Sequence, residues 1–281
     1  MKVAIKLDRC YTGDMNIFVA LILGIVQGLT EFIPVSSSGH LEIIQQLIGE
    51  RGENFHLFLE FINLGTLLAL LIYFRKRIAK ILKDIFVHHN FRLAINIIIT
   101  TIPAVTVGLL LSSFIEENGF FSSIYTIAVA MGLIGIVMIV IDKLPHLSHL
   151  KDEDALTKPR ALGIGLAQVL ALIPGTSRSG STIIAGRLVG LNSASAAEYS
   201  FLASIPIMCG VCLKMFISSS SREYLVDNWQ ILLFANVVAF IFGMIALKFV
   251  MSYLKKSHAL KTFGYYRVIL AMTVLIVNLI Q

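Results

Sequence analysis

The sequence predicts an all-α polytopic membrane protein, in which six spans and two re-entrant helical hairpins form a single integral membrane domain over residues 1–281. The first observation is composition: 57% of the residues are hydrophobic, 14% are charged and the mean hydropathy is +0.83, far outside the range of soluble domains. The second is that the apolar runs are continuous over about 20 residues, which suits helices and not the alternating strands of a membrane barrel. The third is an internal repeat in the order of hairpin and spans.

The first half starts with an apolar segment, residues 17–34, that a proline ends. A serine-rich turn follows, and the next apolar segment, residues 41–49, is only about half as long as a span. A segment of that length suits a re-entrant hairpin, which enters the membrane, breaks and leaves on the same side. Three full-length apolar segments complete this half: residues 57–74, 93–111 and 120–141.

The second half repeats this plan. GLAQ at residues 165–168 opens it as GIVQ at residues 24–27 opens the first half, and a proline and a serine-rich turn follow in both. Gly39 and Gly180 each come twelve residues after the glutamine of their half. Three full-length apolar segments again follow: residues 201–217, 230–250 and 266–280.

Two repeat halves result, covering residues 17–141 and 161–280. Because each half holds an odd number of spans, the two copies must be inverted with respect to the membrane. Two hairpins that enter from opposite faces can then meet near the midplane of the bilayer, each with a helix N-terminus directed at a shared site.

The charges favour this topology. Lys and Arg number 23 against 17 Asp and Glu, and the basic residues lie between the spans, which suits cytoplasmic loops beside anionic lipid and not a nucleic-acid surface. With the loop 75–92 inside, the acidic linker 112–119 lies outside and the basic loop 142–160 lies inside. The basic residues before position 10 instead favour an inside N-terminus and a full first span, whereas the repeat favours a hairpin that enters from outside.

The first candidate site lies in the stretch GIVQGLTEFIPVSSSGH at residues 24–40. Gln27 and Glu31 are four apart and share one helix face. A carboxylate and an amide oxygen suit Mg²⁺ or a similar cation, with substrate phosphates completing its shell. Ser36–Ser38 and His40 add hydroxyls and an imidazole that titrates near neutral pH. Ionisable groups in hydrocarbon indicate a functional site, and the alternative is that Glu31 only hydrogen-bonds neighbouring helices.

The second candidate site is PGTSRSGST at residues 174–182. Glycines and hydroxyls at the start of a helix form a cradle for phosphate, and Arg178 adds a planar, permanently charged fork that matches phosphate oxygens. The similarity to a P-loop is superficial, because Ser181 and not lysine follows Gly180 and no strand precedes the motif. Arg178 buried without an anion would be hard to explain, and the alternative to phosphate is a simple pair with Glu31.

At these two motifs the chain resembles the undecaprenyl-diphosphate phosphatase family, the bacitracin-resistance membrane phosphatases. The first family signature, which ends in P-V-S-S-[ST]-G-H, is similar to residues 27–40, and the second, P-G-x-S-R-S-G-x-T, is similar to residues 174–182. The resemblance runs nearly end to end. It implies hydrolysis of the terminal phosphate of the C55 polyprenyl diphosphate, which recycles the lipid carrier for cell-wall synthesis and gives bacitracin resistance. It also implies a divalent cation, Mg²⁺ or Ca²⁺, and a site open to the outer side of the bacterial plasma membrane.

The resemblance also implies roles for residues at matching positions. Glu31 would help to hold the metal, Ser37 and His40 would act at the phosphorus, and Arg178 would clamp the diphosphate. The side chains expected to line the diphosphate are Ser36, Ser177, Ser179 and Thr182. Gln27 is a departure, because many family members have glutamate there; the amide removes a negative charge from the metal site and leaves open how strongly a cation binds.

Two alternatives remain open from the sequence. Either Ser37 attacks and forms a phospho-enzyme, or it orients a water molecule that His40 deprotonates. A transporter or flippase of polyprenyl phosphate or another anion is the alternative function, since inverted repeats with opposed hairpins are transporter architecture. The acid and the imidazole beside the hydroxyls favour an enzyme, because binding alone does not need them. The expected partners are the polyprenyl diphosphate lipid and the bilayer, with no nucleic acid; a homodimer stays open.

Overall fold

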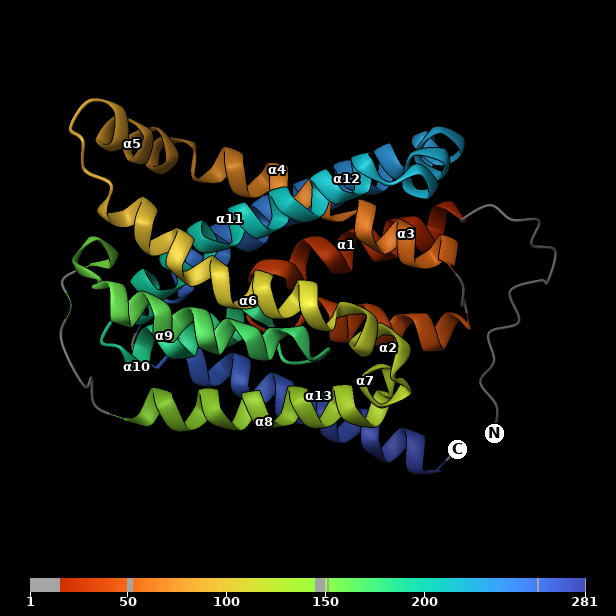
Figure 1. The fold of residues 1–281 in the computed structure, drawn as a ribbon. Helices are drawn as coiled ribbons and strands as arrows, with labels where there is room; N and C mark the ends of the chain where they lie inside the picture. Colours follow the sequence, from red (N-terminus) through yellow and green to blue (C-terminus); the bar gives the residue numbers. More distant parts are fainter. Residues whose placement is uncertain (1–15, 50–52, 145–149, 151, 257, 281) are drawn as a thin grey trace.

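The computed structural model describes residues 16–49, 53–144, 150, 152–256 and 258–280, and in this part of the chain every regular element is a helix. Figure 1 shows the helices running side by side in one elongated bundle. The α-helices are α1 (Ile17–Phe32), α2 (Ser37–Ile48), α3 (Glu53–Phe61), α4 (Asn63–Tyr73), α5 (Arg75–Phe86), α6 (Arg92–Glu117), α7 (Gly119–Ser122), α8 (Ile124–Lys143), α9 (Lys158–Val169), α10 (Arg178–Leu188), α11 (Ser193–Ile217), α12 (Ser219–Tyr253) and α13 (Leu260–Ile280). Two short 3₁₀ helices are η1 (Glu153–Ala155) and η2 (Leu170–Leu172).

Six of the described segments are long and apolar enough to cross a membrane, which confirms the predicted number of spans and the all-α class. They are Asn54–Tyr73, Arg92–Leu111, Ile124–Lys143, Ser193–Ile217, Ser219–Tyr253 and Leu260–Ile280. Their bounds differ from the predicted ones. The largest difference is at α12, which begins at Ser219 because the chain stays helical through a kink at Asn228, where φ is −117° and ψ is 16°. The basic residues before position 10 lie outside the described residues.

The basic stretch after the first span is itself helical. It forms α5, an amphipathic helix with no buried residue, which Figure 1 shows at one end of the bundle. One of its residues is anchored: Arg77 Nη2 lies 2.7 Å from both Glu153 Oε1 and Asp154 Oδ1, and Arg77 Nε lies 3.3 Å from Glu198 Oε1. Three separate segments are therefore joined at this end of the molecule.

The two serine-rich turns have the same local structure. α1 ends at Phe32 and Pro34 follows in the turn, because proline lacks the N–H that a continuing helix would need. Ser36 then takes a positive φ of 77° and caps α2 by accepting from the N–H of Gly39. Ser177 does the same at φ 73° for α10, accepting from the N–H of Gly180. Each turn thus presents the N-terminus of a short helix.

The two pairs of short helices come from opposite ends of the bundle. In Figure 1 the ends of α1 and α2 that lie far from their turn are at the right, whereas those of α9 and α10 are at the left. α1 packs on α12 at its glycines: a Cβ on Gly24 or Gly28 would lie 2.8 Å or 2.6 Å from the carbonyl oxygen of Ala235 or Ala239. Glycines four residues apart thus allow the backbones of α1 and α12 to approach closely. α9 packs in the same way on α6, with Gly165 against the backbone of Thr100.

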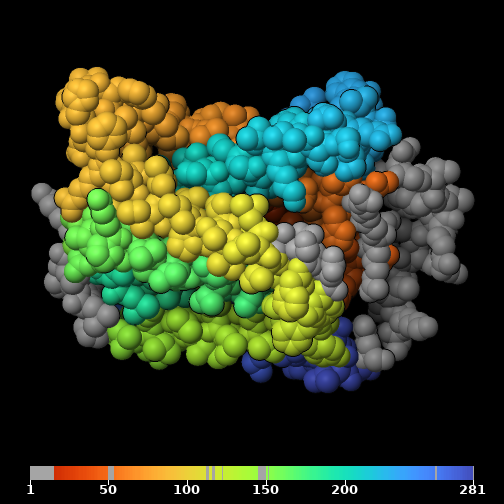
Figure 2. All heavy atoms as spheres, in the orientation of Figure 1, coloured from red at the N-terminus to blue at the C-terminus, as the bar shows by residue number. Residues whose placement is uncertain are grey.

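Helix α8 lies against both turns and pairs with α13 along its length. Position 175 requires glycine for two reasons. Its φ of +90° is a backbone conformation that other residues rarely adopt, and a Cβ there would collide with the carbonyl oxygen of Ile127. On the other turn, Gly39 packs on the sulfur of Met131. Figure 2 shows α6, in yellow, extended across one face of the molecule between α11 and α9. The turns are therefore enclosed by spans on several sides.

Candidate functional site

The two serine-rich turns meet at the carboxylate of Glu31. Arg178 Nη2 donates to Glu31 Oε1 at 2.7 Å, although the two residues are 147 apart in the sequence. Ser37 donates its hydroxyl proton to Glu31 Oε2 at 2.7 Å, and Gln27 Nε2 donates to the same oxygen at 3.1 Å. The Glu31 and Arg178 side chains are 12% and 19% exposed. The expected convergence of the two motifs is confirmed, and the pair between these residues is formed.

Gln27 is held from its other side by a residue that the sequence did not single out. Its Nε2 also donates to Asn63 Oδ1 at 2.7 Å, and Asn63 Nδ2 donates to the carbonyl oxygen of Leu59 at 3.0 Å. Gln27 is almost completely buried. The one available sequence signal for Asn63 was an amide inside the apolar run FLEFINLGTLL.

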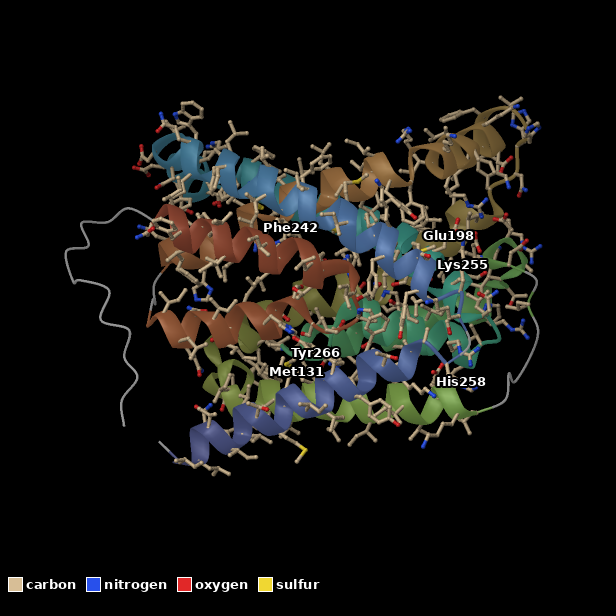
Figure 3. All side chains as sticks on the ribbon, turned by 180° about the vertical axis from the view of Figure 1, so that it is seen from behind. Met131, Glu198, Phe242, Lys255, His258 and Tyr266 are labelled. Atoms are coloured by element: carbon tan, nitrogen blue, oxygen red, sulfur yellow. The ribbon has the colours of Figure 1, made fainter. Side chains whose placement is uncertain are left out.

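His40 is fixed through both ring nitrogens. Nδ1 lies 2.7 Å from the carbonyl oxygen of Ser36 and Nε2 lies 2.7 Å from the hydroxyl of Tyr266. Because a carbonyl can only accept, Nδ1 carries the proton, and in the neutral ring Nε2 accepts from Tyr266. The Ser37 hydroxyl therefore faces Glu31 and not His40. Figure 3 shows Tyr266 close to Met131, part-way along the bundle.

The remaining predicted residues lie in the two turns and at the start of α10. Ser36 and Ser177 are the two helix caps described above, and the Ser179 hydroxyl is 3.3 Å from that of Ser177. The Thr182 hydroxyl donates within α10 and lies 2.6 Å from the Ser200 hydroxyl, so it joins α10 to α11. These positions put all the predicted residues in one region, and their contacts with phosphate stay predictions.

A second arginine, Arg267, contacts both turns from α13. It is completely buried, and its guanidinium donates to the carbonyl oxygens of Pro34, Gly175 and Thr176 as well as to that of Met131. The sequence signal that could have found it is an arginine inside the last apolar run, GYYRVILAM.

The donor set for a divalent cation is small. Among the described residues no group of three or more His, Cys, Asp and Glu side chains is placed to hold a metal ion. Glu31 is the carboxylate that Arg178 contacts, and the amide oxygens of Gln27 and Asn63 belong to adjoining side chains. Such a set fits a hard cation only together with oxygens of a bound substrate.

An apolar cavity of about 590 Å³ reaches Arg178. It lies between α6, α11 and the turn at the end of α9, and only three of its described lining residues are polar: Gln168, Arg178 and Lys214. Arg178 Nη2 lies 3.8 Å from the sulfur of Met208 on α11. Lys214 is in the last turn of the same helix. The cavity thus extends from the site along α11 toward its C-terminal end.

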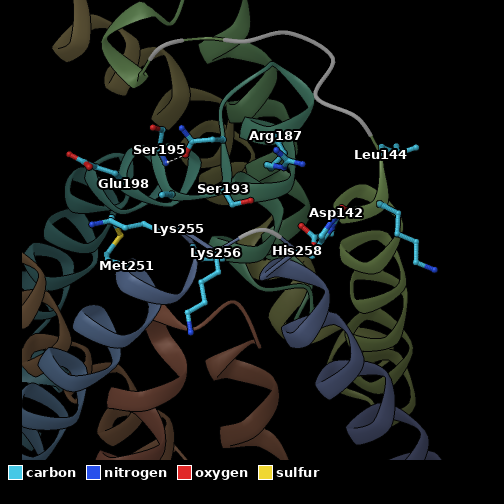
Figure 4. Close-up of a pocket in the computed structure, with 14 residues that line it drawn as sticks. Asp142, Leu144, Arg187, Ser193, Ser195, Glu198, Met251, Lys255, Lys256 and His258 are labelled. Atoms are coloured by element: carbon cyan, nitrogen blue, oxygen red, sulfur yellow. Dashed lines mark hydrogen bonds between the residues drawn. The ribbon is translucent and has the colours of Figure 1, made fainter.

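A second cavity, of about 800 Å³, lies at the other end of α11. Figures 3 and 4 show Glu198 close to Lys255 on one side of this cavity, and Figure 4 shows His258 beside Asp142 on the other side, near Arg187. None of its described lining residues is a predicted site residue. The candidate site is therefore associated with the first cavity and not with this one.

The comparisons with known proteins point to one family. The family model described as bacitracin resistance protein BacA matches residues 20–273. Undecaprenyl-diphosphatase 1 of Clostridioides difficile is 40% identical over 269 residues, covering 93% of this chain and 96% of the relative. Undecaprenyl-diphosphatases of Thermoanaerobacter sp. and Pseudomonas paraeruginosa are 39% and 36% identical, covering 93% and 92% of this chain and 96% and 92% of the relatives. With both motifs, five of the six spans and most of the sixth inside the matched region, the chain belongs to the bacitracin resistance protein BacA family.

Proposed function

We propose that this protein hydrolyses undecaprenyl diphosphate to undecaprenyl phosphate and inorganic phosphate in the bacterial plasma membrane, and that it thereby confers bacitracin resistance. Its relatives are named undecaprenyl-diphosphatases. The single observation that carries the proposal is the constellation of Ser37, Glu31 and Arg178, in which a hydroxyl, a carboxylate that accepts its proton and a cation stand within hydrogen-bond distance. Phosphoryl transfer requires a positioned nucleophile and positive charge near the phosphoryl oxygens.

The geometry favours Ser37 as the nucleophile. Its proton passes to Glu31 Oε2, its oxygen attacks the terminal phosphorus, and the bond to the bridging oxygen breaks, so that undecaprenyl phosphate leaves. Water then hydrolyses the phosphoserine and restores the hydroxyl. Arg178 is placed to exchange its contact with Glu31 for the phosphoryl oxygens, where its planar fork matches their charge and shape. A water route through His40 is less favoured, because Tyr266 already occupies Nε2.

A divalent cation, Mg²⁺ or Ca²⁺, is part of this proposal. Glu31, with the amide oxygens of Gln27 and Asn63 once their side chains turn, would hold it together with diphosphate oxygens. When bound, the cation supplies positive charge that stabilises the phosphoryl oxygens. Gln27 as it stands donates to Glu31, so this chain needs no cation to keep that carboxylate in place.

The apolar cavity supports a lipid substrate. The polyprenyl tail would lie between α6 and α11 while the diphosphate reaches Arg178 and passes Lys214 at the mouth. The helix pairs α1–α2 and α9–α10 would be the two re-entrant hairpins of an inverted repeat. Basic residues lie on α5 and around the cavity in Figure 4, and they favour a cytoplasmic position for that end of the bundle. The other end, where Lys214 lies, is then open to the outer side.

The experiment is phosphate release from C55 polyprenyl diphosphate by purified protein with Mg²⁺. We expect turnover by the wild type and its loss in Arg178→Gln, while Arg222→Gln, at an exposed arginine on α12, keeps it. Flux of labelled polyprenyl phosphate across vesicles without phosphate release would instead support a transporter.

The tail position has its own test in the same assay. Gly210 lines the cavity and has open space around its Cβ position, so Gly210→Trp should raise KM for the C55 substrate and leave a short-chain diphosphate unaffected. Gly119→Trp, at an equally open position outside this cavity, is the matched control. An equal effect on both chain lengths would exclude this tail position.

A further inference from the structure

We propose that Arg267, in the last span, is the positioning residue that holds the two serine-rich turns in register, so that Ser37 and Arg178 face the same carboxylate. The inference rests on the proposed function for its kinetic consequences. Its structural part depends only on the contacts of Arg267.

Those contacts are unusual for a buried charge. Arg267 is 0% exposed, and no carboxylate of the described residues lies within 4.0 Å of its guanidinium. All its described hydrogen bonds go to backbone carbonyls: Nε to Met131 at 3.1 Å, Nη1 to Pro34 at 3.3 Å, and Nη2 to Gly175 and Thr176 at 2.7 Å and 3.0 Å. A charged group without a counter-ion is costly to bury, so its retention in a span indicates a function.

The accepting carbonyls show what that function is. Pro34 belongs to the first turn, three residues before Ser37, and Thr176 belongs to the second, two residues before Arg178. Turn carbonyls have no partner of their own in a helix, so a buried turn needs an external donor. One guanidinium supplies that donor to both turns at once and also ties them to α8. The separation of the turns is therefore set by a rigid planar group and not by contacts within either turn.

Other side chains could not do the same. A lysine keeps the charge, but its single ammonium cannot present the fork that reaches carbonyls in three directions. A methionine has comparable length and suits the apolar surroundings, but it donates nothing. Arg222 provides a natural comparison, because it also donates to two backbone carbonyls, those of Phe216 and Ile217, but is exposed and makes these contacts where α11 joins α12.

The test compares Arg267→Met, Arg267→Lys and the control Arg222→Met by hydrogen exchange and by kinetics in detergent. The reporter amides are Val35 N–H, which donates to Ile33, and Thr176 N–H, which donates to Ile173. We expect both to exchange about tenfold faster or more in Arg267→Met, because each turn loses a hydrogen bond to a charged group. Arg267→Lys should be intermediate, and Arg222→Met should match the wild type.

In the kinetic arm, kcat per folded molecule should fall by about 100-fold in Arg267→Met, since a misplaced reactive group costs that much. KM should stay within about threefold, because Arg267 does not touch the substrate in this account. Three results in Arg267→Met would each overturn the proposal: exchange at the two turns at the wild-type rate, faster exchange spread evenly over all six spans, or an unchanged kcat. A wild type that releases no phosphate would refute the proposed function instead, and the exchange result would still decide the role of Arg267.

Discussion

Replacing Glu31 by glutamine isolates the charge of the carboxylate that the two turns share. Glutamine has nearly the same shape, but Ser37 and Arg178 donate to different oxygens of Glu31, and the single amide oxygen of glutamine can replace only one of these two acceptors. What is lost is a base for the Ser37 proton, since His40 Nε2 is directed at Tyr266. Losing a positioned general base lowers the rate by about 10²–10⁴-fold, which corresponds to about 3–5 kcal/mol of transition-state stabilisation.

The same substitution has a separate effect on stability. Removing one partner of a buried ion pair costs about 3–5 kcal/mol, because the remaining charge stays buried without compensation. Arg178 is 19% exposed, so the effect should be at the lower end of that range. A non-hydrolysable diphosphonate analogue supplies a new anion for Arg178, and it should therefore raise the thermal midpoint of Glu31→Gln more than that of the wild type.

The assay is phosphate release normalised to the folded fraction, with Glu60→Gln as the control at an exposed acid of the neighbouring span. We expect kcat to fall in Glu31→Gln by the factor given above and to be unchanged in Glu60→Gln. If Glu31→Gln kept more than about a tenth of the wild-type kcat, this carboxylate would not be the base. A proton route through His40 would then have to be considered again.

The two remaining predictions concern the neighbours of this carboxylate. Tyr266→Phe removes the donor to His40 Nε2. It should lower kcat by about two- to tenfold, which is the effect of losing one hydrogen bond, and it should change the pH–rate profile. An identical profile would show that Tyr266 has no part in the reaction. Gln27→Glu places a second carboxylate beside Glu31 and removes the donor to Asn63. Because the two carboxylates repel each other, the protein should be less stable without divalent cations. It should also reach half-maximal activity at about tenfold lower Mg²⁺ concentration. Titrations with Mg²⁺ and Ca²⁺ beside the wild type measure this change, and equal cation dependence would contradict it.

Much of the site could be predicted because it is encoded locally. Pro34 and the serines that follow it specify a broken helix and a new helix N-terminus within a few residues, and the second half repeats the pattern. The number of spans followed from the length of the apolar runs. The helical α5 and the long α12 were missed, because amphipathic and polar helices at the ends of spans have no hydropathy signal that separates them from loops.

The residues that the sequence analysis missed are those whose role depends on tertiary packing. Asn63, Tyr266 and Arg267 lie in spans, far along the chain from the residues that they contact. A single polar residue in an apolar run shows that something must satisfy it, but not which partner does so. Only the arrangement of α13 against α8 and both turns identifies those partners.

The crossed packing of the two halves also affects the order in which the protein can be assembled. α1 packs on α12, and α9 packs on α6, so α1 lacks its packing partner until residues 219–253 have left the ribosome. A nascent chain released early would carry Glu31 and Ser37 without the arginine and the helix that hold them. Unfinished products would be inert toward the lipid carrier, and their unpaired intramembrane charge would expose them to quality-control proteases.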